Sequence, residues 1–265
     1  MRALVLGLGE AGSIYARGLR DAGFNVVGFD PFTALSEPGV RQEVDLAVAA
    51  EGVELVFSVV GARAARGVAE AALPVLARGA IFADLNTGSP ELKAEIGELA
   101  GSRGILFADV AVLAPVPRAG LLTPLLVSGP GAEPLRAALA AAAVPVEVIP
   151  GKPGDAAARK LLRSVFMKGL AAVMLESVGA AKQIGADGWL REQIAAEFSG
   201  DPQALIQRLL DGSRVHAARR AHEVEDARDF LESLDQPSFV TQAAREWYDV
   251  FLSDSAEHGA SKVDV

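Results

Sequence analysis

The sequence contains no cysteine among its 265 residues. Disulfide bonds and thiolate metal sites are therefore excluded. Aromatic residues make up only 6% of the chain. No apolar run approaches the ~20 residues that a membrane-spanning helix needs, so we expect no membrane segment. The apolar strand pattern starts at residue 2, which leaves no room for a leader, and we expect a cytoplasmic protein.

Positive charge is also scarce, because the net charge is −9 at pH 7. This balance argues against a nucleic-acid partner. The composition, 51% hydrophobic and 22% charged, is typical of a globular protein with one or two domains. The histidines are His216, His222 and His258. The first two are six residues apart, off the spacing of a helical metal pair, so we predict no metal site.

The first thirty residues carry the strongest motif. Residues 2–6 form a short apolar run, a helical pattern covers 13–22, and a second apolar run covers 25–29. Between the first run and the helix lie three glycines in the spacing G-x-G-x-x-G, at Gly7, Gly9 and Gly12. In this context the glycines allow a tight turn, close approach of a diphosphate and close helix packing. The N–H groups of the first helical turn then attract the diphosphate. The predicted cofactor-binding loop is Gly7, Leu8, Gly9, Glu10, Ala11 and Gly12.

Asp30 ends the second strand, about 20 residues beyond the glycines, where a carboxylate accepts hydrogen bonds from the adenosine ribose. A 2′-phosphate would be repelled by this carboxylate and would need a nearby arginine. The next arginine is Arg41. We therefore predict NAD as the cofactor, with NADP as the alternative.

Strands and helices alternate over the first 150 residues, which predicts a doubly wound, parallel Rossmann sheet. The polar turns after the strands should line one cleft, because ligands bind at the carboxyl ends of such strands. The expected strands are 2–6, 25–29, 55–60, 80–85, 105–110, 125–128 and 144–149; the expected helices are 13–22, 62–78, 91–100 and 132–143.

The Pro- and Gly-rich segment 150–154 marks a boundary between a dinucleotide-binding domain, 1–150, and an all-helical domain, 151–265. The second domain opens with a long helix, 155–184, and further helices are expected at 187–199, 201–211, 213–234 and 238–253. We expect this helical domain to bind substrate and to form a homodimer, because a helical domain built on one long helix exposes much apolar surface.

The long helix carries Lys160, Ser164 and Lys168 on one face, at i, i+4 and i+8. Lysines in an otherwise apolar helix are either snorkelling side chains or functional groups. A lysine in a dry cleft beside a dinucleotide has its pKa lowered by desolvation and can serve as acid or base. Lys168 or Arg163 could hold an anionic group of a substrate.

The chain resembles the β-hydroxyacid dehydrogenase family, which includes 3-hydroxyisobutyrate and 6-phosphogluconate dehydrogenases. The resemblance rests on the glycine loop and on the segments 84–90, 109–112 and 154–160. It implies that Lys160 is the general acid/base and that Asn86 and Thr87 flank the nicotinamide. It also implies that Ser58, Val59 and Val60 run beside the cofactor.

Two positions depart from the family pattern. Ser164 stands where the family usually has asparagine. After Val112, where the family has Ser-Gly-Gly, the chain has Leu113-Ala114-Pro115, and a proline has no N–H to offer a substrate carboxylate. Val112 and Leu113 are candidate substrate contacts. Both departures resemble a branch of 6-phosphogluconate dehydrogenase-like proteins with a distinctive helical C-terminal domain.

Three hypotheses follow. The first is an NAD-dependent oxidoreductase that acts on a small hydroxy acid or related alcohol, with Lys160 as acid/base and with Ser164 and Asn86 positioning the substrate. The second is an imine or ketone reductase on the same fold, favoured by the two departures. The third is a dinucleotide-binding protein that senses or scaffolds without chemistry.

Overall fold

The computed structural model describes residues 1–35 and 38–260, with side chains up to residue 254. The chain divides into two compact units, Met1–Arg163 and Ser164–Val265, which we call the sheet unit and the helical unit. The division falls inside a long helix, α7, Asp155–Gln183, rather than at the breaker segment 150–154. The reason is that Ala156 and Ala157, in its first turn, are buried within the sheet unit.

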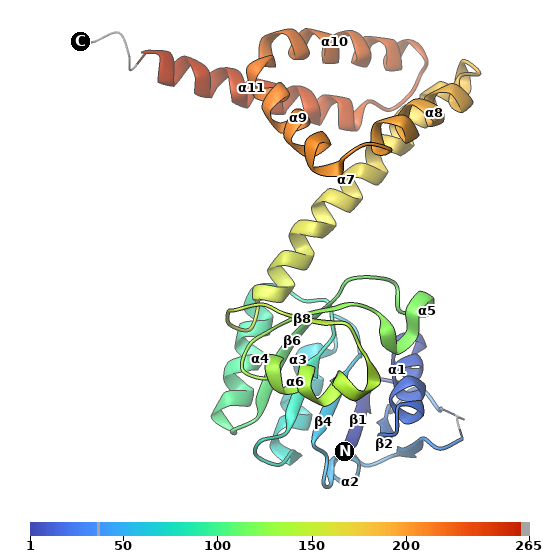
Figure 1. The fold of residues 1–265 in the computed structure, drawn as a ribbon, viewed down its shortest axis with the longest axis vertical. Helices are drawn as coiled ribbons and strands as arrows, with labels where there is room; N and C mark the ends of the chain where they lie inside the picture. Colours follow the sequence, from blue (N-terminus) through green and yellow to red (C-terminus); the bar gives the residue numbers. More distant parts are fainter. Residues whose placement is uncertain (36–37, 261–265) are drawn as a thin grey trace. The chain divides into compact units, whose positions relative to one another are not determined.

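The sheet unit contains one eight-stranded sheet in the order β3-β2-β1-β4-β5-β6-β7-β8 (Figure 1). The predicted fold class is confirmed, with one difference: β7 runs antiparallel to β6, while the other neighbouring strands are parallel. The strands are β1 Arg2–Leu6, β2 Asn25–Phe29, β3 Arg41–Glu43, β4 Leu55–Ser58, β5 Ile81–Asp84, β6 Leu106–Val112, β7 Leu125–Ser128 and β8 Val146–Val148.

Helices cover both faces of this sheet, and alternate residues of each strand pack on opposite sides. Val5 of β1 packs in one apolar cluster with Tyr15 of α1 and Leu135 of α6. Leu4 packs in the other cluster with Ile96 of α4. The helices are α1 Glu10–Asp21, α2 Leu46–Ala50, α3 Ala65–Ala72, α4 Pro90–Ser102, α5 Val116–Ala119 and α6 Ala132–Leu139, with 3₁₀ turns η1 Leu73–Val75, η2 Gly120–Leu122 and η3 Ala140–Ala142.

Local sequence explains most of these boundaries. Ser89 caps α4 by accepting a hydrogen bond from the N–H of Leu92, and Pro90 occupies the first turn, so the helix expected from residue 91 begins at Pro90. The helix expected over 62–78 is shorter: α3 ends at Ala72, and Pro74 lies in the 3₁₀ turn that follows. Helix α5 and η2 follow Pro115 in a stretch where no element was expected.

The described part of the helical unit consists of the rest of α7 and four further helices. The helix expected over 213–234 begins later, at Ala217. The reason is that α9 continues to Val215, and His216 separates the two helices. Asp201 caps α9 through the N–H of Gln203. The bounds are α8 Asp187–Phe198, α9 Pro202–Val215, α10 Ala217–Ser233 and α11 Phe239–Ala260.

We expected no apolar stretch of membrane-spanning length, and helix α7 corrects this expectation: it is long and apolar enough to cross a membrane, judged by length and composition alone. Only 11% of its most apolar window is buried. A single helix of this kind is weak evidence for a membrane, and an exposed apolar helix is equally what a protein–protein interface requires. The absence of a membrane partner remains a prediction.

Candidate active site

The glycine turn lies at the carboxyl end of β1, as the motif predicts. Gly7 has a φ of +87°, and a Cβ there would meet the carbonyl oxygen of Val59 at 2.5 Å. A Cβ on Gly12 would lie 1.9 Å from the carbonyl oxygen of Gly7. Gly9 differs from both, because a Cβ there would meet nothing within 4 Å. Gly7 and Gly12 therefore let the turn and α1 pack closely, whereas Gly9 faces open space.

That open space is a cavity of about 340 Å³ at the switch point of the sheet. Its lining includes five predicted cofactor residues, namely Gly7, Gly9, Asp30, Val59 and Val60. The N-cap of α1, Gly9, carries no side-chain cap, so the first N–H groups of the helix are available to an anion. An apolar cavity with a helix N-terminus and a carboxylate at its rim fits a dinucleotide.

The carboxylate of Asp30 accepts hydrogen bonds from three backbone N–H groups of the protein itself. Its Oδ2 accepts a hydrogen bond from the N–H of Leu8 at 2.7 Å, and its Oδ1 accepts from Phe32 and Thr33 at 2.8 and 3.0 Å. Partial burial by itself would raise the pKa of this carboxyl, but these hydrogen bonds lower the pKa below its ordinary value. Asp30 thus stays ionised and also ties the glycine turn to the end of β2.

The remaining residues of the predicted loop have other surroundings. The side chain of Leu8 packs in the core, against Gly28 of β2. Glu10 and Ala11 begin α1, and Glu10 is exposed. Neither lines the cavity, so Glu10 and Ala11 would reach a ligand through their backbone, whereas the N–H of Leu8 is already bonded to Asp30.

Asn86, just after β5, is buried and its amide is fully used within the protein. Its Nδ2 donates to Ser58 Oγ at 2.9 Å and to Asp84 Oδ1 at 2.6 Å. Its Oδ1 accepts from the N–H groups of Val60 and Gly61 at 2.7 and 2.8 Å. Asn86 therefore shapes the turn after β4 and has no hydrogen-bonding capacity left for substrate. Ser58, which accepts from Asn86, is itself buried.

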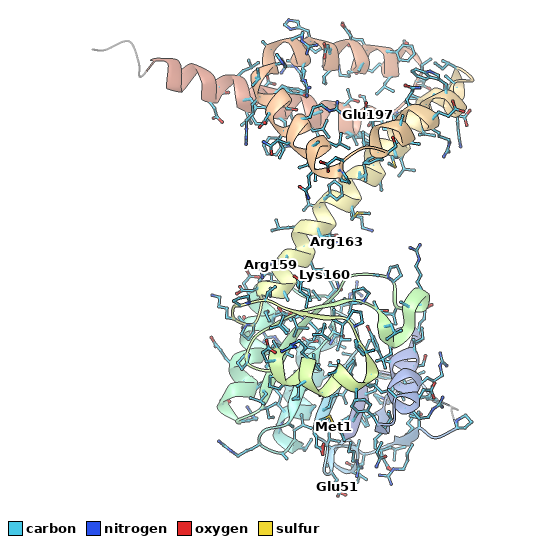
Figure 2. All side chains as sticks on the ribbon, viewed as in Figure 1. Met1, Glu51, Arg159, Lys160, Arg163 and Glu197 are labelled. Atoms are coloured by element: carbon cyan, nitrogen blue, oxygen red, sulfur yellow. The ribbon has the colours of Figure 1, made fainter. Side chains whose placement is uncertain are left out.

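Lys160 lies in the second turn of α7, where Figure 2 labels it with Arg159 and Arg163. Its Nζ is 3.3 Å from Thr87 Oγ1, in the turn after β5. Burial lowers the pKa of this ammonium below its ordinary value, the charge of Lys93 lowers it further, and Asp109 opposes the change. The structure thus brings together two residues, Lys160 and Thr87, that lie 73 positions apart in the sequence.

The other predicted substrate residues are not joined to this pair. Ser164 and Lys168 belong to the helical unit, and Arg163 is exposed at the end of the sheet unit. Within the described part of the sheet unit, no hydrogen bond or ion pair links the side chain of Arg163 to Lys160 or Thr87. Val112 ends β6, and the N–H of Leu113 is bonded to the carbonyl oxygen of Pro124 at 3.0 Å.

One part of the site was missed. Lys93 of α4 is buried between Asp84 and Asp109, at 3.1 and 3.6 Å from their carboxylate oxygens. The signal was present: Lys93, Ile96 and Ala100 are spaced for one buried helix face.

For the histidines the prediction was only that they bind no metal. In the region described, no cluster of three or more potential metal ligands occurs.

The fold and the glycine turn define a dinucleotide-binding protein of the Rossmann class. Residues 3–138 match the family described as the NAD binding domain of 6-phosphogluconate dehydrogenase, and the chain belongs to this family. NAD(P) binding follows from this membership. Residues 181–251 match a domain of unknown function, DUF1932, which agrees with the resemblance to a branch with a distinctive helical domain.

Individual relatives agree with this assignment. An uncharacterised 28.5 kDa protein of Methanothermus fervidus is 32% identical over 154 residues, 58% of this chain and 59% of that protein's length. The solved structure of the conserved protein MTH1747, described as similar to 3-hydroxyacid dehydrogenases, is 28% identical, with a TM-score of 0.64 over 95% of this chain and 96% of its own. An imine reductase of Streptomyces aurantiacus has a TM-score of 0.76 over 98% and 96% of the two chains; at 21% identity it shares the fold alone.

Proposed function

We propose that the protein is an NAD(P)-dependent oxidoreductase that transfers a hydride between the nicotinamide and the hydroxyl carbon of a small hydroxy acid or related alcohol. The observation that carries this proposal is the half-buried Lys160 ammonium beside Thr87, at the carboxyl end of β5. Parallel strands end at one edge of a sheet, so this pair and the glycine turn after β1 share the edge where ligands bind.

In this proposal Lys160 acts as the general acid/base. Alcohol oxidation requires a group that removes the hydroxyl proton, and the reverse reaction requires one that returns it. Burial lowers the pKa of Lys160, so a larger fraction of its amine is neutral near pH 7 than for an ordinary lysine. Thr87 orients Nζ through its hydroxyl oxygen. The nicotinamide, when bound, accepts or donates the hydride.

A second candidate function is the reduction of an imine or ketone that carries no carboxylate. One observation favours it: the segment after β6 has few donors for a carboxylate. The N–H of Leu113 is already bonded to Pro124, and Pro115 has no N–H. A dinucleotide-binding protein without chemistry is the remaining alternative, and it predicts that Lys160 is dispensable.

We further propose that NAD is preferred to NADP and that the protein is a homodimer through its helical unit. Asp30 would repel a 2′-phosphate, and Arg41, the first arginine after it, forms an ion pair with Glu43 at 2.7 Å. The dimer is supported by the exposed apolar side chains of α7, among them Val165 and Leu175, which are 73% and 78% exposed.

Cofactor binding is the first test, measured as the shift of the melting temperature with NADH or NADPH. We expect a larger shift with NADH. Asp30→Asn keeps an oxygen that can accept from Leu8 but removes the charge, so the preference for NADH should narrow. The matched control is Asp45→Asn, which alters a carboxylate that caps α2 instead. No shift with either cofactor would overturn the oxidoreductase proposal.

Catalysis is tested by screening hydroxy acids, ketones and cyclic imines with wild type and Lys160→Met. We expect Lys160→Met to lower turnover at least ~100-fold, the usual contribution of a general acid/base, while NADH still shifts the melting temperature. The control is Lys152→Met, an exposed lysine just before α7. Full activity in Lys160→Met would exclude the assigned role.

A further inference from the structure

A buried charge cluster lies beneath the Lys160–Thr87 pair. The Nζ of Lys93 donates to the carbonyl oxygen of Asp84 at 2.8 Å and forms ion pairs with Asp84 Oδ2 at 3.1 Å and Asp109 Oδ1 at 3.6 Å. The three side chains are at most 2% exposed. Fully buried lysine is rare unless it is paired, and burying three charges is costly. The fold tolerates this cost at the edge where the proposed reaction takes place.

The cluster is connected to the helix that carries Lys160. Asp109 Oδ2 accepts hydrogen bonds from the N–H groups of Gly154 and Ala157, both at 3.0 Å, and from Ser128 Oγ at 3.2 Å. These N–H groups belong to the start of α7, where a helix favours negative charge. Lys160 follows Ala157 by one turn. Asp109 therefore fixes the N-terminus of α7 on one side and contacts Lys93 on the other.

Substrate has no access to Lys93. The cavity shared by Lys93, Asp109, Thr87 and Lys160 measures about 10 Å³, which is about one water molecule. Any effect of Lys93 on the reaction must therefore act through a neighbouring residue, and Lys160 lines the same cavity. The charged groups that bear on Lys160 are Lys93 of α4 and Asp109 of β6, with Asp84 of β5 behind Lys93.

We propose that Lys93 is a positioning residue of this site, whose buried ammonium offsets Asp84 and Asp109 so that Lys160 does not become the ion-pair partner of those carboxylates. The inference rests on the proposed role of Lys160 as acid/base. Without Lys93, two carboxylates would face Lys160 with no cation between them, and their attraction would hold its amine protonated. With Lys93 present, Lys160 remains free to exchange a proton with substrate.

The test measures the titration of Lys160 directly, without any substrate. Reductive ¹³C-methylation labels accessible lysines of the intact chain, which has six in all, and the signal of Lys160 is identified by its loss in Lys160→Arg. We expect Lys93→Met to raise the pH midpoint of this signal by about one unit or more, because attraction to two carboxylates is no longer offset. Asp84→Asn should lower the midpoint. Lys152→Gln, which removes an exposed positive charge in the same unit, should leave it unchanged.

Shifts of opposite sign distinguish a charge effect from simple damage to the fold, which would move the midpoint toward the ordinary lysine value in both variants. Lys93→Arg, which keeps the charge, should shift the midpoint less than Lys93→Met. If Lys93→Met does not melt cooperatively, Asp84→Asn decides: an unchanged or raised midpoint overturns the inference. The titration needs no substrate, so its outcome can be distinguished from a failure of the proposed function. The proposed function fails if Lys160→Met retains activity.

Discussion

The two units of the chain solve the problem of burying apolar surface in different ways. The sheet unit buries large side chains on both faces of its sheet, including Phe57, Phe82 and Phe107. Within the described part of the helical unit, only five apolar residues are buried. Four are alanines and one is a leucine: Ala180, Ala181, Ala217, Ala221 and Leu231. A monomer rarely leaves so much apolar helix surface uncovered. The sheet unit thus buries its own apolar surface, whereas the apolar surface of the helical unit supports our proposal that a second copy covers it.

Glycine substitutions give the largest expected contrast between the units. Gly12→Ala should destabilise the sheet unit by more than about 2 kcal/mol, because the new Cβ would lie 1.9 Å from a backbone oxygen that cannot move aside. Gly169→Ala in α7 should stabilise the helix by ~0.5–1 kcal/mol, because its Cβ meets nothing within 4 Å. Calorimetric unfolding of both variants measures the difference. A loss of stability in Gly169→Ala would mean that this side of α7 is covered in solution.

The proposed dimer gives the next prediction. Leu175 lines an apolar groove of about 690 Å³ with Val178 of α7 and Ile194 of α8. Leu175→Glu would place a charge in the proposed dimer interface. We expect the dissociation constant of the dimer to rise at least ~10-fold, which equals about 1.4 kcal/mol. Light scattering over a concentration series measures this change. Gln183→Glu is the control, since it adds the same charge at an exposed polar position of α7.

A wild-type protein that is monomeric at every concentration would refute the proposed dimer. Recovery of the wild type with lipid vesicles, abolished by Leu175→Glu, would instead favour the membrane as the partner of α7. Either result would assign the difference to the helical unit, because we expect the sheet unit to melt at the same temperature in Leu175→Glu and in Gln183→Glu.

Most of the sheet unit was predictable from the sequence, and the reason is local. The glycine turn, the cap at Ser89 and the apolar strands each depend on residues that are close in the chain. The antiparallel step between β6 and β7 was not predictable in this way, because a short apolar strand such as Leu125–Ser128 has the same pattern in either direction.

The site was predictable only in part for the same reason. Lys160 was found from its helix and from a family resemblance. Its contact with Thr87 and the Asp84–Lys93–Asp109 cluster depend on where α4, β5 and β6 meet in space. The hydrogen bonds that occupy the Asn86 amide oxygen likewise depend on the position of the turn after β4. Long-range contacts of this kind leave no spacing pattern in the sequence.

The smallest predicted effect concerns a polar contact between α7 and α11 in the helical unit. Glu176 of α7 accepts hydrogen bonds from the N–H groups of Val240 and Thr241, at 2.8 and 2.9 Å, and from the hydroxyl of Thr241 at 2.6 Å. Partial burial would raise the pKa of Glu176, but these hydrogen bonds lower it below its ordinary value of 4.5. A lowered pKa in the folded state stabilises the protein above the pKa of the unfolded chain, and this stabilisation is lost as the pH falls through the folded value.

Glu176→Gln should therefore cost about 1 kcal/mol at pH 7, the usual value of a helix cap, and should cost less once the pH is well below 4. The measurement is the melting temperature of wild type and variant between pH 3 and pH 7. The helical unit, with few buried side chains, should show the loss, while the sheet unit should not. Glu197→Gln serves as the control, because Glu197 forms only an exposed ion pair, with Arg208. A constant difference across this pH range would mean that the charge of Glu176 contributes nothing, and that the cap depends on its oxygen atoms alone.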